Sequence, residues 1–178
     1  QATLTSPMAT ALFPIPGGLK ELLHETDPAF CLQHSGQLLL KEINKWPAQR
    51  NACTEKPNQI ILNIRPGHIE MLLSQQGIPL AYTFQPWLHE DDVLYYLFRL
   101  AGQFQATPEN CHLIIPGDFT AGTSLRSKLS AFFPEMIRPA APSSFSLQTD
   151  LSAVSAEAFY LLNQDCQCAS SEVHIKEG

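Results

Sequence analysis

Three consecutive acidic residues, Glu90, Asp91 and Asp92, form one group of side chains that could do chemistry. Clustered carboxylates can hold divalent ions, which lie about 3.5–4 Å apart in two-metal sites. Acidic residues are also favoured in the first turn of a helix, where they meet the positive end of its dipole. Apolar residues follow at helical spacing, at Val93, Leu97, Leu100, Ala101 and Phe104. The sequence therefore favours a helix N-terminus in solvent over a metal site.

A second group could supply metal ligands, namely Cys166, Cys168 and His174, with Cys111 and His112 as further candidates. The Cys-x-Cys spacing is not that of a usual zinc knuckle, and no second pair follows at a matching distance. We therefore expect no metal site, and interpret the two thiols as partly buried at a helix end.

His68 and Glu70 are separated by one residue, so a strand would place both on the same face. We interpret them as a pair on the protein surface, because dispersed histidines and acids define no catalytic arrangement by spacing alone.

Three strands and a helix position these residues. Residues 59–65, 68–74 and 80–84 are apolar and rich in β-branched or aromatic side chains, and Pro66-Gly67 and Gly77 mark the turns. Because both connections are short, the three strands must pair antiparallel as a meander. The apolar period then changes to that of a helix from His89 onward.

The rest of the second half continues the alternation of helices and strands. Residues 111–115 form a short apolar run that suits a strand covered on both faces, as in a parallel sheet. We expect a helix at 122–133, a strand at 136–138 and a helix at 153–164; the predicted inward residues of the first helix are Leu125, Leu129, Phe132 and Phe133. The order β-β-β-α-β-α-β-α, with right-handed crossovers, predicts an α/β fold with a mixed five-stranded sheet of ribonuclease H-like topology.

The first part of the chain is harder to interpret. Residues 8–13 and 31–34 could be strands, and residues 19–24 and 35–46 carry apolar side chains at helical spacing. A polar, proline-bounded segment at 47–58 is interpreted as a linker. We expect three regions: a partial N-terminal lobe with linker at 1–56, a ribonuclease H-like lobe at 57–168 and a tail at 169–178.

Composition limits the classes of function. The net charge of −6 and pI near 5.4 argue against nucleic acid as a partner, because phosphates are usually met by a surplus of Lys and Arg. No run of about 18 apolar residues could span a bilayer. Five scattered cysteines suit reduced thiols, so we expect a cytoplasmic protein.

The stretch from Phe84 to Leu97 resembles a bacterial family of unknown function that adopts the actin-like ATPase fold. The residues that carry the resemblance are Phe84, the three acids at 90–92, Leu94-Tyr95-Tyr96 and the strand at Leu113-Ile-Ile-Pro-Gly117. Two ribonuclease H-like lobes side by side form such proteins, which include pilus-assembly and cell-division relatives. The resemblance implies that residues 4–46 are the remaining part of a first lobe.

Actin-like ATPases bind nucleotide partly through the first hairpin of each lobe, where an acid and backbone donors face the phosphates and the metal. The resemblance places Asn63, Arg65 and Gly67 at this hairpin. Asn63 stands where an acid is expected, Pro66 has no N–H to donate, and only Gly67 permits close backbone approach.

A second nucleotide element of actin-like ATPases follows the fourth strand, where paired glycines meet the adenosine. Gly117, Asp118 and Gly122 occupy that place here. Asp118 replaces one glycine, and its charge would disfavour a nearby phosphate. The resemblance therefore implies a degenerate site, with Mg-ATP as a possible ligand, and favours a non-catalytic protein over an enzyme.

A ribonuclease H-like sheet also hosts metal-dependent nucleases, which usually place one metal-binding carboxylate on the first strand. Residues 59–65 contain no acid. We therefore consider nuclease activity the weakest hypothesis.

Aromatic residues concentrate around the junction between the third strand and the helix, and Trp87, Tyr95 and Tyr96 could anchor an interface. Core packing explains them equally well. The leading hypothesis is a non-catalytic or weakly nucleotide-binding scaffold or assembly module that acts through a protein partner or self-association. The alternative is a working ATPase completed by residues that precede Gln1.

Overall fold

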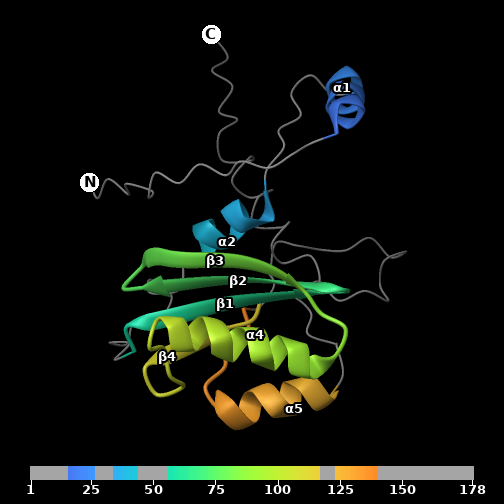
Figure 1. Ribbon diagram of the computed structural model, residues 1–178. Coiled ribbons are helices and arrows are strands. Elements are labelled where there is room, and N and C mark those ends of the chain that lie inside the picture. Colours follow the sequence, from blue (N-terminus) through green and yellow to red (C-terminus); the bar gives the residue numbers. More distant parts are fainter. Residues whose placement is uncertain (1–15, 27–33, 44–55, 117–122, 140–178) are drawn as a thin grey trace, which may run out of the picture.

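The computed structural model describes residues 16–26, 34–43, 56–116 and 123–139 (Figure 1). The helices are α1 (Gly17–Thr26), α2 (Ser35–Ile43), α4 (Glu90–Gln103) and α5 (Thr123–Phe132). The strands are β1 (Asn58–Arg65), β2 (His68–Gln75), β3 (Ile78–Pro86) and β4 (Cys111–Ile114). The predicted helix at 153–164, the predicted strand at 8–13 and, apart from His34, the predicted strand at 31–34 lie outside these residues.

The four strands form one mixed sheet in the order β3-β2-β1-β4. β1, β2 and β3 pair antiparallel, which confirms the predicted meander, and β1 pairs parallel with β4. Both tight turns use residues in the left-handed region: Gly67 has φ 78°, and Gln76 and Gly77 have φ 51° and 81°. Two successive positive φ angles are those of a type I′ turn, whose twist suits a two-residue hairpin.

The predicted fifth strand at 136–138 contributes a single parallel bridge between Ile137 and Ile114. The Ile115 N–H donates to the Ile137 carbonyl at 2.9 Å, and the Ile137 N–H donates to the Leu113 carbonyl at 2.8 Å. The segment therefore lies beside β4, where a fifth strand would lie, but too few residues pair for a strand to form in the described part of the chain.

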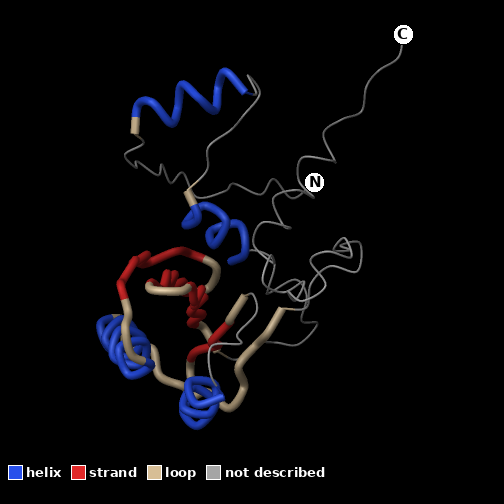
Figure 2. The backbone as a smooth tube through the Cα atoms, turned by 90° about the vertical axis from the view of Figure 1, so that its right-hand side faces the viewer, coloured by secondary structure: helices blue, strands red, loops and turns tan. Residues whose placement is uncertain are grey.

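Helices cover both faces of the sheet, as the end-on view of the strands shows (Figure 2). α4 and α5 pack on one face, against side chains such as Ile60, Leu62, Met71 and Leu113. α2 packs on the other face, where Leu39 and Ile43 meet a smaller apolar cluster of Ile61, Leu72, Ile114 and Ile137. The strands alternate between these two clusters because successive side chains point to opposite faces.

Two predictions about burial are wrong. Phe132 was expected inside, but its side chain is 47% exposed, because α5 turns only Leu125 and Leu129 fully toward the sheet and Phe133 follows its last turn. Glu70 was expected at the surface, but it is 2% exposed because β2 is an interior strand covered by α2.

None of the helices within the described residues is long and apolar enough to cross a membrane. α1 matches the helix expected at 19–24, yet its Leu19 and Leu22 side chains are 45% and 59% exposed.

Candidate functional site

The carboxyl ends of β1 and β4 lie at the same edge of the sheet, because the two strands are parallel neighbours with Ile61 opposite Ile114. Open α/β sheets bind ligands at such an edge, outside the carboxyl ends of their strands. The hairpin that carries Asn63, Arg65 and Gly67 follows β1 at this edge. Gly117, Asp118 and Gly122, predicted for the second nucleotide element, lie outside the described residues.

Asn63 does not face an open cleft. Its side chain is buried, with 3% exposed, and its Nδ2 donates a hydrogen bond of 2.7 Å to Oε2 of Glu70. Glu70 lies directly opposite on β2. The amide that stands where an actin-like ATPase is expected to have an acid is therefore held inside the protein.

Glu70 is the centre of a buried polar cluster on the face of the sheet under α2. Its Oε1 accepts hydrogen bonds from the Tyr82 hydroxyl at 3.1 Å and from the hydroxyl of Ser35, the first residue of α2. Burial raises the pKa of Tyr82 to about 12, and the neighbouring Glu70 charge adds to the shift. The cluster, defined by Ser35, Asn63, Glu70 and Tyr82, ties the start of α2 to three strands.

Close packing at Gly36 supports this cluster. A Cβ atom at position 36 would lie 3.1 Å from His34 Nδ1 and 3.1 Å from ring atoms of Tyr82. The Gly36 N–H donates to His34 Nδ1 at 3.0 Å, and the rings of His34 and Tyr82 meet edge to face. The sequence does not predict these contacts, because only the packing of α2 on the sheet brings the three residues together.

Arg65 and Gly67 are held by Trp87, which follows β3. The Trp87 indole donates to the Arg65 carbonyl at 2.8 Å, and the Trp87 backbone N–H donates to the Gly67 carbonyl at 3.1 Å. A Cβ atom at position 67 would meet nothing within 4 Å, so a ligand could approach the Cα of Gly67. The structure gives Trp87, predicted as an interface residue, a partly buried position against the core.

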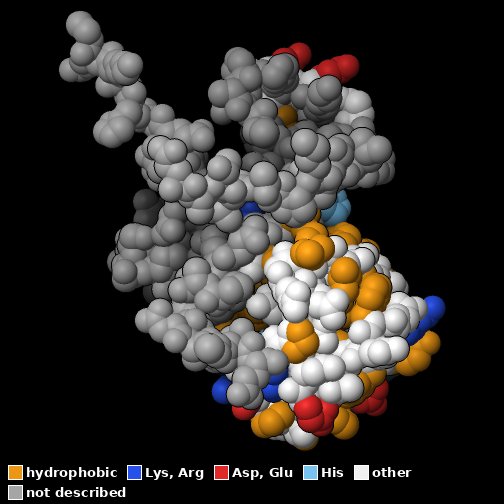
Figure 3. All heavy atoms as spheres, turned by 90° about the vertical axis from the view of Figure 1, so that its left-hand side faces the viewer, with side chains coloured by type: hydrophobic (Ala, Val, Ile, Leu, Met, Phe, Trp, Pro, Cys, Tyr) orange, Lys and Arg blue, Asp and Glu red, His pale blue; other side chains and the backbone are white. Residues whose placement is uncertain are grey.

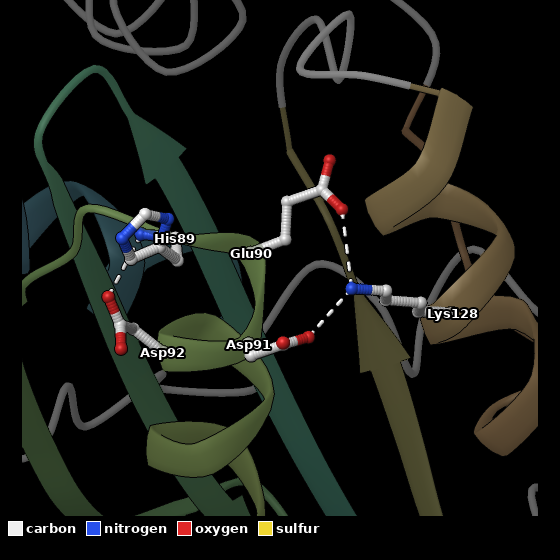
Figure 4. Close-up of polar contacts among 5 residues, drawn as sticks. All are labelled: His89, Glu90, Asp91, Asp92 and Lys128. Atoms are coloured by element: carbon white, nitrogen blue, oxygen red, sulfur yellow. Dashed lines mark hydrogen bonds and ion pairs between the residues drawn. The ribbon is translucent and has the colours of Figure 1, made fainter.

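The acidic cluster begins α4, as predicted (Figure 4). The backbone N–H groups of Leu88 and His89 donate to Asp92 Oδ2 at 3.0 and 2.9 Å, which lowers the pKa of Asp92. Asp91 and Glu90 pair with Lys128 of α5 at 2.6 and 3.6 Å, and these contacts raise the pKa of Lys128. Each carboxylate has a structural role in joining or starting helices.

Metal ligands do not gather in the described ranges, where no three His, Cys, Asp or Glu side chains come together. Cys111 is buried in β4, and burial raises the pKa of its thiol to about 12, so it stays protonated at neutral pH. Cys166, Cys168 and His174 lie outside the described residues.

Aromatic side chains form an exposed patch where α4 meets α5. Tyr95, Phe98 and Phe132 are 59%, 36% and 47% exposed. Phe98 meets Phe132 edge to face, with ring centroids 4.9 Å apart. Of the predicted interface residues, exposed Tyr95 lies three residues before Phe98 on α4, and its ring meets that of Tyr96 edge to face at 5.3 Å. Tyr96 itself is half-buried against the core. The concentration of aromatic residues near α4 could have identified Phe98 as a surface residue. The predicted inward position of Phe132 gave no such indication.

A cavity of ≈ 220 Å³ lies between α4 and β3, on the face of the sheet that α4 covers. Its walls mix polar side chains with two apolar ones, and consist of Met71, Thr83, Gln85, Tyr96, Arg99, Leu100 and Gln103.

The comparisons with known proteins agree with this architecture. The model of a family described as "Protein of unknown function (DUF3822)" matches residues 1–136. A search of curated proteins finds no match. One solved structure, a Bacteroides thetaiotaomicron protein described as having an actin-like ATPase fold and unknown function, is similar with a TM-score of 0.58 and 17% identity. The similarity covers 70% of this chain and 47% of that protein, so the chain spans about half of its length.

The family match covers most of the chain, so the chain belongs to the DUF3822 family of proteins of unknown function, and its fold is the actin-like ATPase fold.

Proposed function

We propose that this DUF3822 protein is a non-catalytic or weakly nucleotide-binding scaffold that acts through protein contacts. The observation that carries the proposal is the Asn63–Glu70 hydrogen bond of 2.7 Å. A Mg²⁺ ion that binds nucleotide phosphates is usually also held by one or two carboxylates of the protein. Here the position holds a neutral amide that is already committed to a buried partner.

The aromatic patch supports the second half of the proposal. Exposed Phe98 and Phe132 lie together, exposed Tyr95 precedes Phe98 by three residues on α4, and Tyr and Phe are enriched in the buried centres of protein interfaces. The Asp91–Lys128 ion pair lies on the same two helices and would supply a polar rim. A partner with an apolar centre and mixed charge at its border fits this surface.

A working ATPase is the alternative, and one observation favours it. The parallel β1–β4 pair brings two strand ends to one edge, and the space beside the Gly67 Cα is open there. Such an ATPase would need an acid and further backbone donors from a part of a longer protein. A nuclease is not favoured by any group of acids within the described segments.

Calorimetric titration of Mg-ATP into the protein, with Mg-ADP as companion, tests the proposal. We expect no heat and no shift of the melting temperature at millimolar nucleotide. Micromolar binding, with a stability gain that grows as RT ln(1 + [L]/Kd), would overturn it in favour of the ATPase.

Tyr95→Ala tests the contact surface, with Leu88→Ala as control because Leu88 is 86% exposed but lies before α4. Association with a partner protein, captured by chemical crosslinking, should weaken only in Tyr95→Ala. Unchanged association in a folded Tyr95→Ala variant would exclude the aromatic patch as the contact surface.

A further inference from the structure

The outer edge of β3 has no neighbouring strand in the part of the chain that the structure describes, because the sheet order is β3-β2-β1-β4. β3 is nine residues long. Three alternate side chains remain exposed on the α2 side of the sheet, namely Leu80 42%, Tyr82 39% and Phe84 53%. Ile78, which lies beyond an irregularity in the β2–β3 register, is also exposed, at 64%. Hydrophobic side chains gather on this part of the surface (Figure 3).

The backbone of β3 also offers open hydrogen-bonding groups. The Trp87 N–H bonds to the Gly67 carbonyl just beyond the His68–Pro86 pair. Because hydrogen-bonded pairs alternate in antiparallel sheets, the N–H and C=O groups of Tyr82 and Phe84 must point away from β2. Pro86 occupies the next outward position, where its missing N–H removes no bond from the β2–β3 ladder.

Charge does not protect this edge. Edge strands are usually guarded by charged side chains that prevent pairing with another chain. Residues 75–88 contain no Asp, Glu, Lys or Arg, although the whole chain has a net charge of −6. Two copies of an acidic protein repel each other least where their surfaces are uncharged.

We propose that β3 pairs antiparallel with β3 of a second copy of this chain, about a twofold axis at Thr83. Tyr82 of one copy then lies opposite Phe84 of the other, and the open N–H and C=O groups of both residues are hydrogen-bonded. The two sheets become one continuous sheet. Pro79 and Pro86 confine the new ladder to the central part of the strand.

The side chains favour this register. Tyr82 and Phe84 from both copies form one apolar row on the α2 side of the joined sheet, and aromatic cross-strand pairs stabilise antiparallel strands. The pairing removes Phe84, now 53% exposed, from water. The β3 pairing does not involve Tyr95, Phe98 or Phe132. The pairing and the aromatic contact surface are therefore independent proposals, and a result against one leaves the other standing.

Sedimentation velocity over a range of concentrations of the full chain tests the pairing. We expect a dimer whose dissociation constant rises at least ~10-fold in Phe84→Lys, because each new charge then lies opposite Tyr82 of the other copy and diagonal to the second new lysine across the ladder. Leu88→Lys is the control, since it adds the same charge at a more exposed position beyond the strand. Tyr95→Ala should leave the dimer unchanged.

A symmetric disulfide tests the register independently and does not need Phe84→Lys to fold. Thr83→Cys places the two thiols on the axis, in a non-hydrogen-bonded pair with Cα atoms about 4.5 Å apart, which a disulfide can span. The variant is made with Cys31, Cys53, Cys166 and Cys168 replaced by Ser, and Gln85→Cys in the same background is the control.

Rapid oxidation of Thr83→Cys to a covalent dimer, with slow oxidation of Gln85→Cys, would support the pairing. A monomer at every concentration, a dimer that Phe84→Lys does not weaken, or equal oxidation of the two cysteine variants would overturn it. A wild type that stays monomeric until a foreign extended peptide is added would assign the edge to strand addition by another protein instead.

Discussion

Asn63 and Glu70 face each other across β1 and β2, and the Asn63 amide donates to the Glu70 carboxylate at 2.7 Å. This bond joins the hairpin expected to meet nucleotide to the cluster that fixes α2. The same carboxylate accepts from Tyr82 and Ser35. The Asn63–Glu70 pair at the candidate nucleotide edge therefore contributes to stability, and we expect its removal to lower the free energy of unfolding.

Glu70→Gln should lower the free energy of unfolding by about 2–3 kcal/mol, because a buried network loses its charge and one of its acceptors becomes a donor. Chemical denaturation measures the change. Glu21→Gln on the exposed face of α1 is the matched control and should stay within about 0.5 kcal/mol of the wild type. Equal stability of the two variants would contradict the assigned role of Glu70.

Alkaline pH should destabilise the protein through Tyr82. Its pKa is raised from 10.0 to about 12, so the folded state holds the phenolic proton more tightly than the unfolded state. The stabilising contribution is complete below about pH 10 and is lost as pH rises toward 12.

Melting temperatures of the wild type and Tyr82→Phe, measured between neutral pH and pH 12, test this dependence. Tyr82→Phe should lose less stability over the alkaline range, since it has no proton to release at this site. Parallel curves for the two proteins would show that Tyr82 titrates normally.

Gly36→Ala and Gly102→Ala should change stability in opposite directions. At position 36 an added Cβ lies 3.1 Å from His34 Nδ1 and from the Tyr82 ring, so α2 must shift. At position 102, within α4, nothing lies within 4 Å, and Ala should stabilise the helix by about 0.5–1 kcal/mol. Thermal melts of both variants decide the matter, and a stabilising Gly36→Ala would show that the packing there is loose.

Trp87→Phe should loosen the β1–β2 hairpin without unfolding the sheet. The indole N–H donates to the Arg65 carbonyl at 2.8 Å, and a net hydrogen bond of this kind contributes about 1 kcal/mol. Hydrogen exchange should accelerate at residues 65–68 and stay unchanged in β4. Exchange that increases equally in both segments would indicate global destabilisation instead.

The sequence by itself determined the elements whose signals are local. Apolar alternation and short turns predicted the β1–β2–β3 meander, and the acids at 90–92 predicted the start of α4, because strand period, turn chemistry and helix capping depend on neighbours along the chain. The same local signals supported the family and fold that the comparisons later showed.

Tertiary structure decided burial and partnership. The sequence predicts Glu70 at the surface, but β2 is an interior strand under α2 and buries it. The sequence predicts Phe132 in the core, but α5 turns this side chain outward. The Ser35–Glu70 and Trp87–Arg65 contacts join residues 35 and 22 positions apart. Such contacts depend on which faces pack together, which residue types and spacing do not specify.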